Sequence, residues 1–86
     1  MQRGWVVLPD YRAAINALKD ACTERGISQH ELARRLNKPP SFVNKIEQLE
    51  RRLDILEFIV IAEAMEMQAD ALLVRLRTSM SDTVTL

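Results

Sequence analysis

The chain has 86 residues, enough for one small domain, of which 48% are apolar and 28% are charged. This balance excludes an intrinsically disordered chain, and no apolar run reaches the length of a membrane span. The 12 basic and 12 acidic residues give a net charge of zero, although DNA-binding domains usually carry a basic excess. The single cysteine, Cys22, excludes an internal disulfide and indicates a reducing cytoplasm.

The charges are unevenly distributed along the chain. Residues 34–52 hold six basic and two acidic side chains, a net charge of +4, whereas residues 54–70 hold five acidic side chains and no basic one. This division predicts one surface that faces phosphates and another that faces away from them. The basic residues are Arg34, Arg35, Lys38, Lys45, Arg51 and Arg52.

Helical periodicity is present throughout, and the first predicted helix covers residues 10–25. Its apolar side chains follow the three-four spacing of one buried stripe, and Gly26 is suited to end it. The stripe consists of Tyr11, Ala14, Ile15, Leu18, Ala21 and Cys22.

A second helix is predicted to begin after Ser28, where Ser28 and Glu31 have the spacing of a reciprocal capping box. Asn37 tolerates the left-handed backbone that a turn requires, so residues 37–39 are expected to form one. Pro40 then suits the first turn of a third helix. Because Leu49 resists a positive φ, this helix is expected to continue toward Glu50.

A fourth helix is predicted over residues 55–65, with a second capping box formed by Asp54 and Glu57. Only Glu57 and Glu63 are polar within it, which predicts burial on more than one side. The expected core stripe contains Ile55, Phe58, Ile59, Ala62 and Met65, while Leu56 and Val60 form a second apolar surface. A fifth helix over residues 69–77 is expected to turn Ala69, Leu72, Leu73 and Leu76 inward.

The second and third predicted helices have the spacing of a helix-turn-helix motif. Counted from Gln29 as position 1, five apolar residues occupy the inward positions 4, 5, 8, 15 and 18. Position 5 needs a small side chain because the other helix crosses close to it, and Ala33 provides one. The five residues are Leu32, Ala33, Leu36, Val43 and Ile46.

Residues 18–73 resemble the lambda-repressor-like, or Xre/Cro-type, helix-turn-helix family. Residues 26–33, with the sequence GISQHELA, are similar to the family's entry into its second helix, and SFVNKIE at 41–47 resembles its recognition helix. The resemblance implies an all-α, compact five-helix domain at 10–77, between an N-terminal arm at 1–9 and a tail at 78–86. It also implies a recognition helix of about Pro40–Gln48 in the major groove.

The family pattern implies roles for individual side chains. The expected base-reading residues are Pro40, Ser41, Asn44 and Lys45. The expected phosphate-binding residues are Gln29, Lys38, Arg51 and Arg52. These side chains suit the tasks, since Lys can donate to guanine, Asn can pair with adenine and Ser can contact either. Many relatives have an arginine at the position of Cys22 that pairs with the residue matching Glu47, so Glu47 must here find another partner or water.

The function expected from these observations is sequence-specific binding of double-stranded DNA by a cytoplasmic, homodimeric transcriptional regulator on a near-palindromic operator. The dimer is expected to use the fourth or fifth helix, and the arm including Trp5. A second hypothesis is an antitoxin or adaptor that binds a partner protein, such as a toxin, through the arm or the tail. No nucleophile–base pair, metal cluster or phosphate loop is evident, so neither enzyme activity nor a cofactor is expected.

Overall fold

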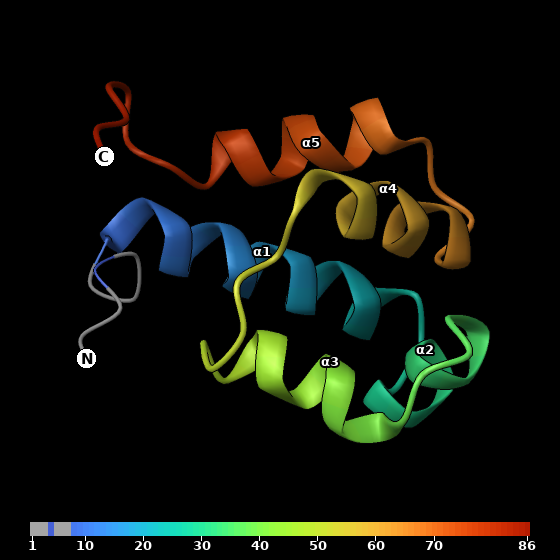
Figure 1. Ribbon diagram of the computed structural model, residues 1–86. Helices are drawn as coiled ribbons and strands as arrows, with labels where there is room; N and C mark the ends of the chain where they lie inside the picture. Colours follow the sequence, from blue (N-terminus) through green and yellow to red (C-terminus); the bar gives the residue numbers. More distant parts are fainter. Residues whose placement is uncertain (1–3, 5–7) are drawn as a thin grey trace.

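The structure is a computed structural model that describes Gly4 and residues 8–86. It contains five helices: α1 (Pro9–Glu24), α2 (Gln29–Arg35), α3 (Pro40–Glu47), α4 (Ile55–Ala64) and α5 (Ala69–Thr78). Helix α1 crosses the middle of the molecule, with α2 and α3 on one side and α4 and α5 on the other (Figure 1). The all-α five-helix prediction is therefore confirmed.

The core lies where α1 meets the other helices. The predicted α1 stripe is correct: Ile15, Leu18 and Ala21 are buried, and Tyr11 is half-buried. The hydroxyl of Tyr11 also accepts a hydrogen bond from the Leu53 backbone N–H at 3.1 Å, which attaches the loop before α4 to α1. Among the described residues, no polar or charged side chain is buried, so the hydrophobic effect is the main stabilising force.

Each of the first four helices ends in the same backbone arrangement. The residue after the C-cap has a positive φ, at Gly26 (71°), Asn37 (60°), Leu49 (62°) and Glu66 (60°). In each case two backbone N–H groups reach back to carbonyls of the last helical turn, as in a Schellman motif. The expectation that Leu49 would prolong α3 is therefore wrong. The N–H groups of Leu49 and Glu50 satisfy the carbonyls of Ile46 and Lys45, at 3.1 and 2.8 Å.

The predicted interior stripe of α4 is right for Phe58, Ala62 and Met65 and wrong for Ile55 and Ile59. Ile55 and Ile59 are 79% and 38% exposed, whereas Ile61 is buried together with Ala62 and Met65. The expectation that α4 would be buried on more than one side is wrong for this single chain. Similarly, Leu73 of α5 was expected to face inward but is 56% exposed.

The two predicted capping boxes differ in outcome. Asp54 and Glu57 form the full reciprocal pair at the start of α4. At the start of α2, the Ser28 hydroxyl accepts from the Glu31 N–H at 3.1 Å, but the Glu31 carboxylate bonds to Arg34 and Arg35. The capping box would have the Glu31 carboxylate accept from the Ser28 backbone N–H. Instead, the carboxylate accepts from the guanidinium groups of Arg34 and Arg35.

The tail after α5 lies near the start of α1. The Ser81 backbone N–H and hydroxyl each donate to the Asp10 carboxylate at 2.8 Å, and these bonds lower the pKa of Asp10. Trp5, Val6 and Val7 of the N-terminal arm lie outside the described residues.

Candidate nucleic-acid interface

Helices α2 and α3 pack closely at the predicted positions. Leu32, Ala33, Val43 and Ile46 are buried, and Leu36 is partly buried. Ala33 is only 1% exposed, which is consistent with the small side chain that the crossing of these helices requires. The motif thus fixes α3 against the rest of the domain and leaves its other face in solvent.

The predicted base-reading residues lie on that outer face. Pro40 is the first residue of α3, and Ser41, Asn44 and Lys45 follow on the exposed side of the helix. Lys45 is in the last turn, where a cation is also favoured by the helix dipole. The structure therefore places these four side chains together and accessible.

Gln29, a predicted phosphate-binding residue, bridges α2 and α3. Its side-chain Nε2 donates to Glu47 Oε1 at 2.6 Å and to Asn44 Oδ1 at 3.4 Å. Glu47 therefore has a partner in place of the arginine that many relatives carry. The same bridge restrains Asn44, so the Gln29 side chain supports the recognition helix in addition to its expected role.

Cys22 is a buried free thiol in α1. Its Sγ donates to Met65 Sδ at 3.6 Å. Burial, with a smaller contribution from the negative charge of Glu47, raises the pKa of the thiol to about 11. The side chain therefore has the character of a core residue and not of a nucleophile.

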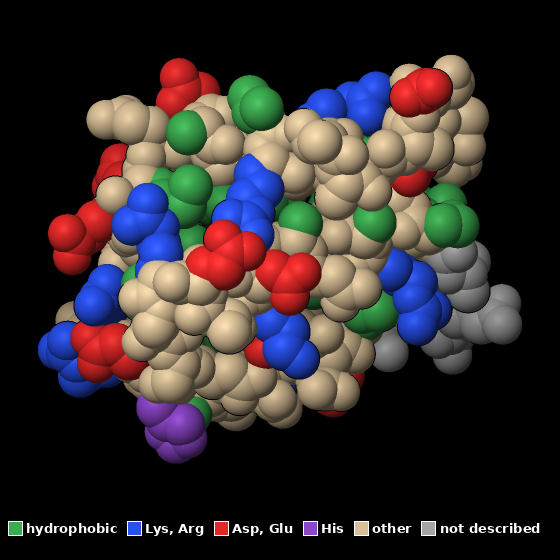
Figure 2. Space-filling model, turned by 180° about the vertical axis from the view of Figure 1, so that it is seen from behind, with side chains coloured by type: hydrophobic (Ala, Val, Ile, Leu, Met, Phe, Trp, Pro, Cys, Tyr) green, Lys and Arg blue, Asp and Glu red, His purple; other side chains and the backbone are tan. Residues whose placement is uncertain are grey.

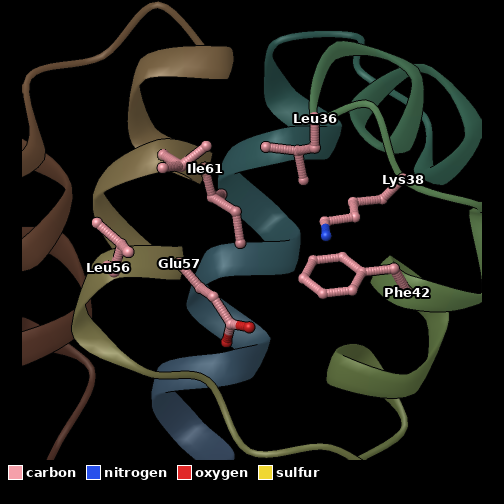
Figure 3. A pocket seen from close by; sticks show the side chains of 7 residues that line it. Leu36, Lys38, Phe42, Leu56, Glu57 and Ile61 are labelled. Carbon is pink, nitrogen blue, oxygen red and sulfur yellow. The ribbon is translucent and has the colours of Figure 1, made fainter.

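Two predicted phosphate-binding cations contact one aromatic ring. Lys38 Nζ and Arg51 Cζ lie 5.6 and 4.8 Å from the centroid of the Phe42 ring. Arg51 also forms an ion pair with Glu57 of α4. Lys38 and Glu57 approach Phe42 from different elements at a small pocket (Figure 3). Phe42 itself is half-buried and packed against the core.

Ion pairs reduce the positive charge of the segment 34–52. Arg34 and Arg35 both bind Glu31, whose pKa falls to about 2 mainly because of its hydrogen bond to Arg34. With Arg51 paired to Glu57, three of the six basic residues of segment 34–52 form no ion pair with the described part of the chain: Lys38, Lys45 and Arg52. Acidic and basic side chains are also interspersed on the rear face (Figure 2). The predicted separation of basic and acidic surfaces is therefore incomplete, because Glu57 folds back onto Arg51.

A different surface is formed by α4 and α5. It is apolar and open, with Ile55 at 79%, Leu73 at 56% and Val74 at 65% exposure. A groove of about 530 Å³ lies between α1, α4 and α5, with Ile55 and Ile59 among its lining residues. The exposed face of α3, in contrast, is mainly polar.

Three contacts of this region had no direct signal in the sequence. These are the Gln29–Glu47 bridge, the Phe42 contact with two cations, and the 2.8 Å hydrogen bond from Arg35 to the Ala64 carbonyl. Each joins different elements, so helical periodicity could not reveal it. The spacing of Gln29 from the third predicted helix is the single feature that could have suggested the first.

Further structural features limit the possible sites. Within Gly4 and residues 8–86, no group of three or more His, Cys, Asp or Glu side chains could hold a metal ion. None of the helices described here combines the length and the apolar content needed to span a membrane.

The comparisons with known proteins agree with this geometry. The helix-turn-helix family profile matches residues 18–72. An XRE-family like protein from Pseudomonas syringae pv. tomato str. DC3000 has a similar solved structure, with a TM-score of 0.74 and 42% sequence identity. The match covers 80% of this chain and 84% of that one. No curated protein sequence matches the chain.

The profile match includes α2 and α3 entirely and extends into α5. The similar structure has the same arrangement over most of both chains. Proteins of this type are in general DNA-binding regulators. The chain belongs to the lambda-repressor-like, or Xre-type, helix-turn-helix family.

Proposed function

We propose that this protein is a transcriptional regulator that binds double-stranded DNA in a sequence-specific manner, with α3 in the major groove. The observation that carries the proposal is the exposed row of Pro40, Ser41, Asn44 and Lys45 on a helix that is fixed from behind by buried Val43 and Ile46. A rigid helix with a polar outer face can present side chains to base edges in a constant register.

The side chains on this face differ in what they can recognise. Lys45 can donate to guanine O6 and N7, and Ser41 can donate or accept. Asn44 can pair with adenine, and its restraint by Gln29 at 3.4 Å favours one orientation of the amide before DNA arrives. We therefore assign base reading to Ser41, Asn44 and Lys45, with Pro40 in contact at the helix start.

Phosphate binding is assigned to residues around the helix. Lys38 precedes α3, Arg51 and Arg52 follow it, and Gln29 lies at the start of α2. Such contacts set the register of the protein on the duplex without reading sequence. Arg52 is exposed. We expect it to reach a phosphate without breaking an ion pair, unlike Arg51, which pairs with Glu57.

We further propose that the regulator is a homodimer that associates through α4 and α5 and binds a near-palindromic operator. The exposed apolar side chains around the α1, α4 and α5 groove support this assignment, with Ile55, Ile59 and Leu73 among them, because monomeric proteins rarely expose such patches. Closed two-fold symmetry is the commonest solution. Recognition helices about 34 Å apart would then reach half-sites roughly ten base pairs apart.

The same surface also supports an alternative from another class. An antitoxin or adaptor would bury it against a different protein, such as a toxin, and zero net charge is compatible with that role. For either function we place the protein in the cytoplasm of a bacterium or of a phage-infected cell. Activity as a repressor is the simplest regulatory outcome, since an operator-bound dimer obstructs the promoter that it covers.

Selection of bound sequences from random duplexes tests the main proposal. A defined motif with two related half-sites is the expected result, whereas failure to enrich any sequence would favour the protein-binding alternative. Lys45→Ala should then cost about 1–3 kcal/mol on the best site and relax the preference at one base pair. Arg52→Ala should weaken binding to all duplexes alike and flatten the salt dependence by about one unit. An equal loss on every sequence for Lys45→Ala would contradict its base-reading role.

A further inference from the structure

Phe42 lies on α3 between two cations that are far apart in the sequence. Lys38 belongs to the turn before α3 and Arg51 to the loop after it, yet both approach the same ring, at 5.6 and 4.8 Å from its centroid. These separations lie within the range in which the quadrupole of an aromatic face attracts a cation. One side chain of the recognition helix therefore restrains two predicted phosphate contacts.

The ring is itself held in place. Phe42 is partly buried against the core, and its backbone N–H donates to the Pro39 carbonyl at 2.9 Å in the first turn of α3. Leu56 and Ile61 of α4 lie across the adjoining pocket of about 220 Å³ from the ring, and Leu36 lies at its top beside Lys38 (Figure 3). The packed ring is therefore more restrained than the long side chains of Lys38 and Arg51.

Arg51 is restrained from further directions. Its guanidinium pairs with Glu57, whose second carboxylate oxygen accepts from the Asp54 N–H at 3.1 Å in the α4 capping box. Its backbone N–H donates to the Lys45 carbonyl at 3.1 Å, at the end of α3. The side chain remains 39% exposed. An arginine has five N–H donors, so the pair with Glu57 leaves donors free for phosphate.

We propose that Phe42 is a positioning residue for DNA binding, whose ring holds Lys38 and Arg51 as one cationic unit for the phosphate backbone. This inference rests on the proposed function. In this role the ring acts through the two cations and not by reading a base. Restraint in the free protein reduces the side-chain entropy that each cation loses when it meets a phosphate, and it links the two contacts to each other.

Phe42→Leu removes the ring and keeps an apolar side chain, whereas Phe42→Tyr keeps a ring with similar attraction for cations. Without DNA, the side-chain proton resonances of Lys38 and Arg51 should show ring-current shifts in the wild type and the tyrosine variant, and lose them in the leucine variant. On a random-sequence duplex, the leucine variant should bind with a salt dependence flatter by about one to two units, and the tyrosine variant should match the wild type.

Combined variants separate positioning from a general loss of structure. In the Phe42→Leu background, Lys38→Ala and Arg51→Ala should have clearly smaller effects on affinity than in the wild type, while Arg52→Ala should keep its full effect. If the leucine variant does not fold, Phe42→Met replaces it, since methionine also fills apolar space without a ring.

The inference is overturned if the folded leucine or methionine variant keeps the wild-type salt dependence. It is also overturned if Lys38→Ala and Arg51→Ala, like Arg52→Ala, lower the affinity as much in that variant as in the wild type. The same holds if the tyrosine variant behaves like leucine. Absence of duplex binding by the wild-type protein is a different outcome, which contradicts the proposed function itself. In that case the ring-current shifts still report whether the ring holds the two cations.

Discussion

The two sides of α1 differ in the kind of surface that they offer. On one side, α2 and α3 bury their apolar residues and expose Ser41, Asn44 and Lys45. On the other side, α4 and α5 bury only part of theirs and leave Leu56 and Leu73 more than half exposed. The helix-turn-helix half is complete as a folded unit, whereas the α4–α5 half has apolar area that a single chain does not cover.

This difference indicates two partners of different chemistry. A polar, rigid helix face gains little from contact with another apolar surface but can exchange hydrogen bonds with base edges. An apolar face gains free energy by leaving water. Substitutions on one side should therefore change one kind of association and leave the other intact.

The largest effect is expected from a charge placed on the α4–α5 surface. Leu73→Asp should weaken self-association by roughly 3 kcal/mol, or about 100-fold, because the carboxylate would be buried without a partner. The monomer should remain folded, since Leu73 is 56% exposed in the single chain. Sedimentation equilibrium over a range of concentrations measures the change.

Ser41→Asp is the matched control on the opposite side. It should leave the dimer intact and abolish DNA binding by repulsion between the carboxylate and the duplex. Should Leu73→Asp self-associate as the wild type does, or should the wild type itself be a monomer with and without operator DNA, α4 and α5 are not the dimer interface. The apolar surface would then be assigned to a different protein partner.

A smaller effect is expected at the crossing of α2 and α3. Ala33 is 1% exposed, so Ala33→Leu should lower the free energy of unfolding by about 1–3 kcal/mol through overpacking. The displaced recognition helix should also bind DNA less tightly. Chemical denaturation and a binding isotherm measure the two losses. Unchanged values for both would mean that the close crossing is not required, and Ala13→Leu, on the half-buried edge of α1, is the control for added volume.

The smallest effect concerns the end of α4. Glu66 has a φ of 60° and its side chain is 82% exposed, with only a 4.0 Å pairing to Arg35. Glu66→Gly should raise the free energy of unfolding by about 0.5–1 kcal/mol, because glycine adopts this backbone without the steric cost. Glu63→Gly, within the helix, should instead be destabilising by about 1 kcal/mol. A thermal melt that shows the same direction for both variants would contradict this account.

Much of the fold could be predicted from the sequence where polar residues mark the helix faces. The inner positions of α2 and α3 were correct because Gln29, Arg34 and Asn44 leave a single apolar stripe in each helix. In α4 the predicted stripe was right for Phe58, Ala62 and Met65 but wrong for Ile55 and Ile59. Only Glu57 and Glu63 are polar there, so several apolar stripes are equally compatible with the sequence, and packing against α5 and α2 selects the one with Ile61 and Ala62.

The exposed part of the candidate site was also predictable, since side chains opposite the buried stripe of α3 must face solvent. The pairings around it were not. From the sequence alone, the Glu31 carboxylate could accept from the Ser28 N–H or from Arg34. In the structure it accepts from both Arg34 and Arg35, because two charge-assisted hydrogen bonds are stronger than one bond to a backbone N–H. The Arg51–Glu57 pair joins residues on either side of a loop, and its geometry depends on how that loop folds. Leu49 adopted a positive φ because two backbone hydrogen bonds and its partly buried side chain offset the steric cost.

The buried thiol of Cys22 can be used to measure how often the core opens. Cys22 is the only cysteine of the chain, and it lies in the core where α1 meets Met65 of the α4 end. With its pKa raised to about 11, it is almost wholly protonated at neutral pH, and a thiol reagent can react only after a local or global opening exposes it. The labelling rate of the unmodified protein therefore measures how often the core around Cys22 opens. Any partner that stabilises the folded state should slow that reaction.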